Sequence, residues 1–145
     1  MIGLIQRVSH ANVIVDSNQI ANIDQGILLL LGVEKSDTKQ NAKELFKKVV
    51  NFRIFEDENQ KMNLSLLDTK GSLLIVPQFT LPADTRKGSR PSFTSAAPPE
   101  LGKTLFDHFI ALSKEQLSKV ETGKFGADMQ VNLCNNGPVT FWLQK

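Results

Sequence analysis

The sequence predicts an α+β fold: a mostly antiparallel, curled sheet with a β-barrel-like core, covered by two long amphipathic helices. Three observations lead to this prediction. Several apolar runs are bounded by glycine or turn residues, two segments have helical periodicity, and apolar and polar residues alternate near the C-terminus. With 145 residues, of which 41% are hydrophobic and 22% charged, the chain suits one globular domain, residues 1–145.

The first third of the chain is predicted to form strands. Residues 1–8 form one strand, and residues 12–16 and 19–23 form a hairpin around a polar turn. The apolar run at residues 27–31 is bracketed by glycines, which is typical of a strand buried on both faces.

Two segments are predicted to be helices. Residues 38–52 have apolar side chains at helical spacing, namely Ala42, Leu45, Phe46, Val49 and Val50. The second helix opens at residues 98–100, where proline suits the first turn and Glu100 favours the positive end of the helix dipole. Its apolar stripe comprises Leu101, Leu105, Phe109 and Leu112.

The segments between and after the helices complete the pattern. Residues 72–76 form a buried strand, and residues 82–99 form a loop rich in Pro, Gly, Ser and Thr. A loop of that length is more often functional than merely connecting. Residues 127–133 and 139–143 each alternate between apolar and polar side chains, which predicts two strands joined by a turn.

Composition argues against several classes of protein. Seventeen basic and fifteen acidic residues give a net charge of +2, too weak by itself to indicate a nucleic-acid binder. The single cysteine, Cys134, is predicted to be a packed thiol, and cysteine usage favours a cytoplasmic location. No apolar run approaches the length of a membrane span. His10, in a predicted turn, and His108, in a helix, have no metal-ligand spacing, so no metal or cofactor is predicted.

The segment Pro-Gln-Phe-Thr-Leu at residues 77–81 ends a predicted buried strand. Because Pro77 cannot donate to a sheet ladder, pairing is expected to lapse there and to free the N–H groups of Gln78, Phe79 and Thr80. Converging N–H groups can stabilise an oxyanion. These residue types are also ordinary in strands, so the residues alone leave both interpretations open.

The segment Asn-Asn-Gly-Pro-Val-Thr at residues 135–140 is the second motif. Asn136 followed by Gly137 is a hairpin signal, and the statistics of X–Pro bonds favour a trans bond to Pro138. A cis bond would instead aim two successive carbonyls in the same direction, where they can hold an ammonium group.

These two motifs and further segments resemble those of the D-aminoacyl-tRNA deacylases of the bacterial and eukaryotic type. The similarity covers essentially all 145 residues, and its strength comes from the order and spacing of the segments. Besides the two motifs, it includes Arg53-Ile54-Phe55, Lys61-Met62-Asn63-Leu64, Ala83-Asp84-Thr85, Arg90-Pro91-Ser92-Phe93, Gly123-Lys124-Phe125 and Ala127-Asp128-Met129-Gln130-Val131.

The resemblance implies hydrolysis of the ester between a D-amino acid and the terminal adenosine of tRNA. This reaction is a proofreading step in translation and a part of D-amino acid catabolism. It also implies action on glycyl-tRNA mischarged on tRNA(Ala). In the family, a cis Gly-Pro segment, here Gly137 and Pro138, enters the partner's active site in a homodimer. Its carbonyls hold the substrate's α-amino group, so that the side chain of an L-amino acid would collide with the protein and the L substrate is rejected.

The resemblance also assigns roles to single residues. Thr80 positions the terminal adenosine or the attacking water, while Gln78 and the Phe79 amide bind near the ester, the amide as an oxyanion donor. Arg7 braces the Gly-Pro segment. Phe125 and Met129 line the substrate pocket, where adenine stacks or packs. The 2′-hydroxyl of the tRNA assists the reaction.

Three charged loop residues and one departure from the family bear on this interpretation. Arg86, Lys87 and Arg90 are predicted to contact tRNA phosphates, with solvated loop charges as the alternative. Most relatives have serine where this chain has Pro77, so neither a hydroxyl nor an N–H is required at that position.

Two alternative functions remain open. One is a related deacylase class with relaxed chirality, whose motif begins with Pro-Gln and which clears L-alanine from mischarged tRNA. The other is a non-catalytic, nucleic-acid-binding dimer, which would bind with steep salt dependence and without turnover.

Overall fold

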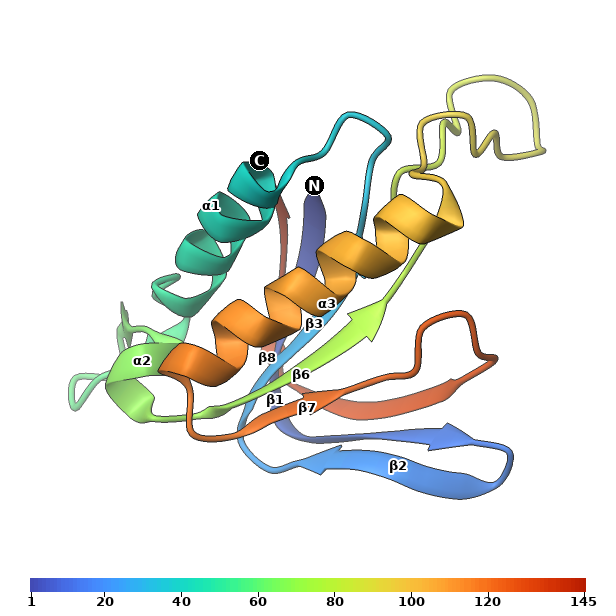
Figure 1. The fold of residues 1–145 in the computed structure, drawn as a ribbon. Helices are drawn as coiled ribbons and strands as arrows, with labels where there is room; N and C mark the ends of the chain where they lie inside the picture. The colour runs from blue at the N-terminus through green and yellow to red at the C-terminus, as the bar shows by residue number, and fades with distance from the viewer.

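The computed structural model describes residues 1–145 and has eight strands and three helices (Figure 1). The strands are β1 (Ile2–Val15), β2 (Asn18–Ile23), β3 (Gly26–Gly32), β4 (Phe55–Glu56), β5 (Met62–Leu64), β6 (Ser72–Pro77), β7 (Val120–Thr122) and β8 (Gln130–Gln144). The helices are α1 (Lys39–Val50), α2 (Leu66–Thr69) and α3 (Pro99–Gln116). The predicted α+β class with two long helices is confirmed.

Strand β1 organises the sheet. It pairs antiparallel with β2 and β3 along one edge and with β8 along the other. Beyond β3, the sheet continues through β6 and β7 in parallel pairs, while β4 and β5 form a separate hairpin. Figure 1 shows β2 and the adjoining ends of β1 and β8 curling away from the helices, which gives the expected barrel-like shape.

Two apolar clusters stabilise this arrangement on opposite faces of the sheet. The larger lies where α1 and α3 cover the sheet, and includes the edge-to-face pair Phe46 and Phe109, with ring centroids 5.8 Å apart. The smaller fills the curl and includes Val13, Ile23 and Leu74. The helices and the curl therefore each bury one face of β3 and β6, as the uninterrupted apolar runs in these strands require.

Helix boundaries follow local chemistry. Thr38 caps α1 in a reciprocal capping box with Asn41, and all five apolar positions expected to face the core are buried. Helix α3 begins at Pro99, as its proline-rich start predicts. No helix in the structure has the length and apolarity needed to cross a bilayer.

Several local predictions were wrong because strands continue through expected turns. Residues 1–8 and 12–16 belong to one 14-residue strand, β1, so His10 lies in a strand and not in a turn. Likewise, β8 runs through residues 136–137, where a hairpin was expected.

Cys134 is an exposed thiol rather than a packed one, because its side chain points to the open face of β8.

Three short elements were not predicted. The charged loop around residues 56–61 is the turn of the β4–β5 hairpin, α2 follows with a capping box between Ser65 and Asp68, and β7 extends the parallel part of the sheet. Each has four or fewer residues in its strand or helix, too short for a periodic signal.

Candidate active site

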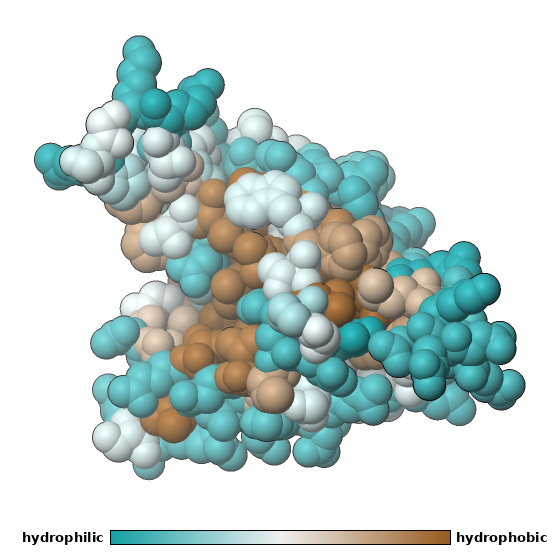
Figure 2. All heavy atoms as spheres, turned by 180° about the vertical axis from the view of Figure 1, so that it is seen from behind, coloured by the Kyte–Doolittle hydropathy of each residue, from teal (hydrophilic) through white to brown (hydrophobic).

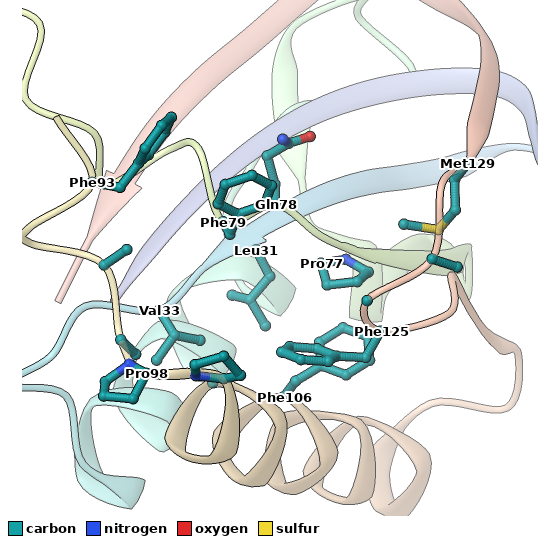
Figure 3. Close-up of a pocket in the computed structure, with 16 residues that line it drawn as sticks. Leu31, Val33, Pro77, Gln78, Phe79, Phe93, Pro98, Phe106, Phe125 and Met129 are labelled. Atoms are coloured by element: carbon teal, nitrogen blue, oxygen red, sulfur yellow. The ribbon is translucent and has the colours of Figure 1, made fainter. Parts of the chain in front are cut away.

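A cavity of about 540 Å³ opens beside the start of α3. Its walls come from the ends of β3 and β6, the segment before α3, α3 itself, and the segment that leads into β8 (Figure 3). Figure 2 shows hydrophobic surface gathered in and beside a hollow on the face of the molecule that Figure 1 hides. The labelled lining residues are Leu31, Val33, Pro77, Gln78, Phe79, Phe93, Pro98, Phe106, Phe125 and Met129.

Two aromatic pairs shape the cavity. Phe106 on α3 and Phe125 have ring centroids 5.9 Å apart with planes tilted by 45°, and Phe79 and Phe93 lie 5.5 Å apart at 48°. The two pairs come from opposite sides of the cavity (Figure 3). Phe79 is 67% exposed and Phe93 43%, so large aromatic faces remain available to a ligand. Aromatic faces of this kind suit the flat surface of a nucleobase.

The first motif supplies polar groups at the edge of this cavity. Pro77 ends β6, as predicted, but the Gln78 N–H donates to the Leu31 carbonyl at 2.8 Å, so the expected free N–H at Gln78 was wrong. The N–H groups of Phe79 and Thr80 donate to no other group of the chain. The Gln78 side-chain amide donates to the Thr80 hydroxyl at 2.6 Å. Two backbone donors and one oriented hydroxyl are thus available beside the cavity.

The second motif lies elsewhere on the surface. Gly137 and Pro138 are exposed and do not line the cavity. The peptide bond between them is cis, which corrects the trans geometry expected from X–Pro statistics and agrees with the family resemblance. Gly137 has a φ of 138°, a conformation that L side chains rarely adopt.

Arg7 holds the backbone beside this motif. Its Nε donates to the Asn136 carbonyl at 2.9 Å and its Nη1 to the Ile54 carbonyl at 2.7 Å, while Nη2 lies 3.7 Å from a carboxylate oxygen of Glu56. Arg7 is only 7% exposed, so these contacts satisfy a largely buried guanidinium. Arg7 does not line the cavity either.

The loop charges do not line the cavity, although Phe93 from the same loop does. Arg86 donates to both carboxylate oxygens of Asp84, at 2.9 and 2.7 Å. These two hydrogen bonds lower the pKa of the Asp84 carboxylate well below its ordinary range and raise the pKa of the Arg86 guanidinium. Lys87 and Arg90 are exposed and form no ion pair.

No ionisable side chain lines the cavity. Elsewhere, the structure brings together no group of three His, Cys, Asp or Glu side chains placed to hold a metal ion. The polar groups available to a ligand in the cavity are therefore backbone N–H groups, the Gln78 amide and the Thr80 hydroxyl.

The structure brings together some of the predicted site residues. Gln78, Phe79, Phe125 and Met129 line one cavity and Thr80 lies beside it, whereas Arg7, Gly137 and Pro138 lie apart from it. Sequence reasoning missed the lining residues Leu31, Phe93 and Phe106. Phe106 lies next to the apolar stripe of α3, so in the sequence it looks like a core residue. Its place in the cavity is evident only from its contact with the partly exposed ring of Phe125.

Comparisons with known proteins agree with the resemblance seen in the sequence. The family model for D-Tyr-tRNA(Tyr) deacylase matches residues 4–144. A D-aminoacyl-tRNA deacylase from Pseudoalteromonas atlantica is 59% identical over 143 residues, covering 99% of each chain. A solved structure titled c-Myc DNA Unwinding Element Binding Protein is 37% identical, with a TM-score of 0.96 over 100% of this chain and 99% of the other.

A second solved structure, titled as a probable eukaryotic D-amino acid tRNA deacylase, is 16% identical and has a TM-score of 0.83, covering 99% of this chain and 98% of the other. At that identity the likeness concerns the fold. The family match and the full-length relative together define a hydrolase of the aminoacyl-tRNA deacylase class, which confirms the predicted enzyme class and its proofreading role. The chain belongs to the D-Tyr-tRNA(Tyr) deacylase family.

Proposed function

We propose that residues 1–145 act as one domain that hydrolyses the ester of D-aminoacyl-tRNA, and of glycyl-tRNA mischarged on tRNA(Ala), to free tRNA and amino acid. The observation that carries this proposal is the pairing of an aromatic cavity with two unbonded N–H groups at its edge, those of Phe79 and Thr80. The aromatic faces suit the terminal adenine, and the N–H groups suit the ester oxygen on which negative charge develops.

The geometry of the cavity supports the following proposed roles. The Phe79 N–H is the proposed oxyanion donor. The Thr80 hydroxyl, held by the Gln78 amide at 2.6 Å, positions the adenosine or the attacking water. Phe125 and Met129 pack against the adenine. Because the lining contains no titratable side chain, the 2′-hydroxyl of the tRNA is the proposed partner in activating water.

Chirality is proposed to be selected by Gly137 and Pro138 of a second copy of the chain. Within one copy these residues are exposed and outside the cavity, so a selector role requires that they reach the cavity of a partner. Strand β8 leaves one edge unpaired and exposes Phe141 and Trp142, by 38% and 51%, which suits association with a second copy. The carbonyls of the Gly-Pro segment would bind the α-amino group, and an L side chain would collide with protein. Glycine has no side chain to exclude, so its ester is cleaved as well.

Two further parts of the proposal concern the tRNA. Lys87 and Arg90, exposed and unpaired in the loop that carries Phe93, are proposed to contact its phosphates, with Arg86 beside them. The location that fits such a substrate is the cytoplasm, where charged tRNA is used.

The test is release of amino acid from D-tyrosyl-, L-tyrosyl- and glycyl-tRNA by the purified protein, with EDTA in parallel. Hydrolysis of the D-tyrosyl and glycyl esters alone, unaffected by EDTA, supports the proposal. Equal hydrolysis of the L-tyrosyl ester would contradict the selector, and complete loss of activity with EDTA would contradict the absence of a metal requirement.

Two alternatives have specific observations in their favour. Pro77 and Gln78 line the cavity, and a motif that begins with Pro-Gln favours a relaxed deacylase acting on L-alanyl mischarged tRNA. The solved structure titled as a DNA unwinding element binding protein favours the nucleic-acid-binding alternative. Adding a tRNA mischarged with L-alanine to the same assay tests the first. Salt-dependent binding of tRNA without release of any amino acid would support the second.

A further inference from the structure

We propose that Asn135 is a positioning residue that holds the Gly137–Pro138 segment in its bulged conformation. This inference deepens the proposed function, because it concerns the residue that shapes the chirality selector. Asn135 does not line the cavity and touches neither Gly137 nor Pro138 through a hydrogen bond. It acts on the backbone that flanks them.

The need for such a residue comes from the register of β1 and β8. Gln6 pairs with Thr140 and Val8 pairs with Asn135. The four residues 136–139 of β8 therefore face Arg7 alone, and they form a bulge in which Gly137 and Pro138 are exposed. Within a bulge the regular ladder bonds are interrupted, so the N–H and carbonyl groups at its two ends need other partners.

The side chain of Asn135 supplies these partners at the far end of the bulge. Its Oδ1 accepts from the Val139 N–H at 2.9 Å, and its Nδ2 donates to the Thr140 hydroxyl oxygen at 2.9 Å. The orientation of the amide follows from chemistry, since a backbone N–H can only donate and must therefore face the oxygen. The side chain of Asn135 thus ties the residue before the bulge to Val139, the last residue of the bulge, and to Thr140, the first residue after it.

The burial of Val139 and two further contacts add to the two hydrogen bonds made by the Asn135 side chain, which together we call the clasp. Val139 is only 9% exposed, so its N–H has little access to water and depends on Asn135. The Gln6 amide donates to the same Thr140 oxygen at 3.3 Å, which joins the clasp to β1. At the near end of the bulge, Arg7 holds the Asn136 carbonyl at 2.9 Å. Arg7 and Asn135 therefore fix the two ends of the bulge.

The test compares Asn135→Leu, which removes both hydrogen bonds at similar volume, with Asn135→Asp, which keeps an acceptor for the Val139 N–H. Asn132→Leu is the matched control, because Asn132 lies on the same strand and bonds only to Asn12. We expect Asn135→Leu to lower the ratio of D-tyrosyl- to L-tyrosyl-tRNA hydrolysis by about tenfold, the loss expected when one hydrogen bond to a buried group is removed. Asn135→Asp should keep the ratio within about threefold, and Asn132→Leu should not change it.

Amide hydrogen exchange of Val139, measured by NMR, gives a second readout that does not depend on activity. Exchange should accelerate in Asn135→Leu and stay slow in Asn135→Asp. If wild-type protein discriminates D from L and Asn135→Leu discriminates equally well, or Val139 exchange does not change, the clasp is overturned while the proposed function stands. If wild-type protein hydrolyses neither ester, the proposed function fails, and the positioning role fails with it.

Discussion

Arg7 Nε lies 2.9 Å from the carbonyl oxygen of Asn136, a residue 129 positions further along the chain. This contact joins the central strand to the bulge that presents Gly137 and Pro138. The same guanidinium reaches the Ile54 carbonyl, so Arg7 connects three separate segments from a position that is 7% exposed. The geometry of the proposed selector is therefore set by a side chain that lies outside the cavity.

Arg7→Lys should destabilise the bulge, because lysine cannot reach two carbonyls with a planar fork. We expect a loss of about 1–3 kcal/mol in the free energy of unfolding, the cost of leaving a buried acceptor unpaired. Hydrolysis of D-tyrosyl-tRNA should fall by more than tenfold, measured in single-turnover assays. Arg53→Lys is the control, since Arg53 bonds to Asn63 on an exposed hairpin and should retain full activity.

Gly137→Ala should reduce hydrolysis of D-tyrosyl-tRNA more than its backbone strain alone explains. A Cβ at Gly137 would lie 2.6 Å from a methyl carbon of Val139 and 3.1 Å from Arg7 Nη2, so the bulge must shift. Gly88→Ala is the matched control: its φ is 66°, and no atom lies within 4 Å of its added Cβ. Both variants should lose about 1 kcal/mol of stability from strain, but only Gly137→Ala should lose D-tyrosyl-tRNA hydrolysis. Equal activity in the two variants would contradict the role of Gly137.

The loop charges should contribute to tRNA binding through salt-dependent interactions. Replacing Lys87 or Arg90 with Ala should reduce the slope of log K against log salt concentration by roughly 0.7–0.9 for each phosphate that is no longer neutralised. Arg86→Ala should change the slope less, because the Arg86 guanidinium already donates two hydrogen bonds to the Asp84 carboxylate, which offsets its charge. Lys43→Ala, on the exposed face of α1, should leave the slope unchanged. Unaltered slopes for Lys87 and Arg90 would show that these are solvated loop charges.

Stability should fall in acid through Asp57. Its carboxylate accepts from the Asn63 side chain and from the Lys61 and Asn59 N–H groups, and these bonds lower its pKa from the ordinary value of 3.8. Since the folded-state pKa lies below the unfolded one, the stabilisation is present above about pH 4 and is lost as the pH falls through the folded-state pKa.

Urea denaturation at several pH values between 6 and 3 measures this effect. Asp57→Asn should flatten the loss of stability below pH 4 relative to the wild-type protein. Asp16→Asn is the control, because the Asp16 carboxylate accepts no hydrogen bond, and its curve should match the wild-type curve. Parallel curves for wild type and Asp57→Asn would contradict the prediction.

Local chemistry made much of the fold predictable. The helix around residues 38–52 could be predicted because its cap and its apolar spacing are both encoded within a few turns. The bulge in β8 could not, because Asn136 followed by Gly137 looks locally like a hairpin. Only the partners Arg7 and Asn135, which satisfy its backbone groups, allow the strand to continue.

The site divides in the same way. Gln78 and Phe79 could be predicted, because a strand that ends in proline places them at an edge. Leu31 and Phe106 could not, since each reads as an ordinary core residue until the sheet and α3 bring them to one cavity. The N–H of Gln78 shows the same limit: only the neighbouring strand β3 provides the carbonyl that it meets.

The central claim is that the cavity and the selector of one active site come from different copies of the chain. Mixing two inactive variants, Gly137→Ala with a damaged selector and Phe125→Ala with a damaged cavity, tests this most directly. If the selector acts across the dimer, refolding the variants together should restore about a quarter of the wild-type rate on D-tyrosyl-tRNA. Half of the randomly formed dimers are then mixed, and each has one intact site. If both parts act within one copy, the mixture should remain as inactive as either variant alone.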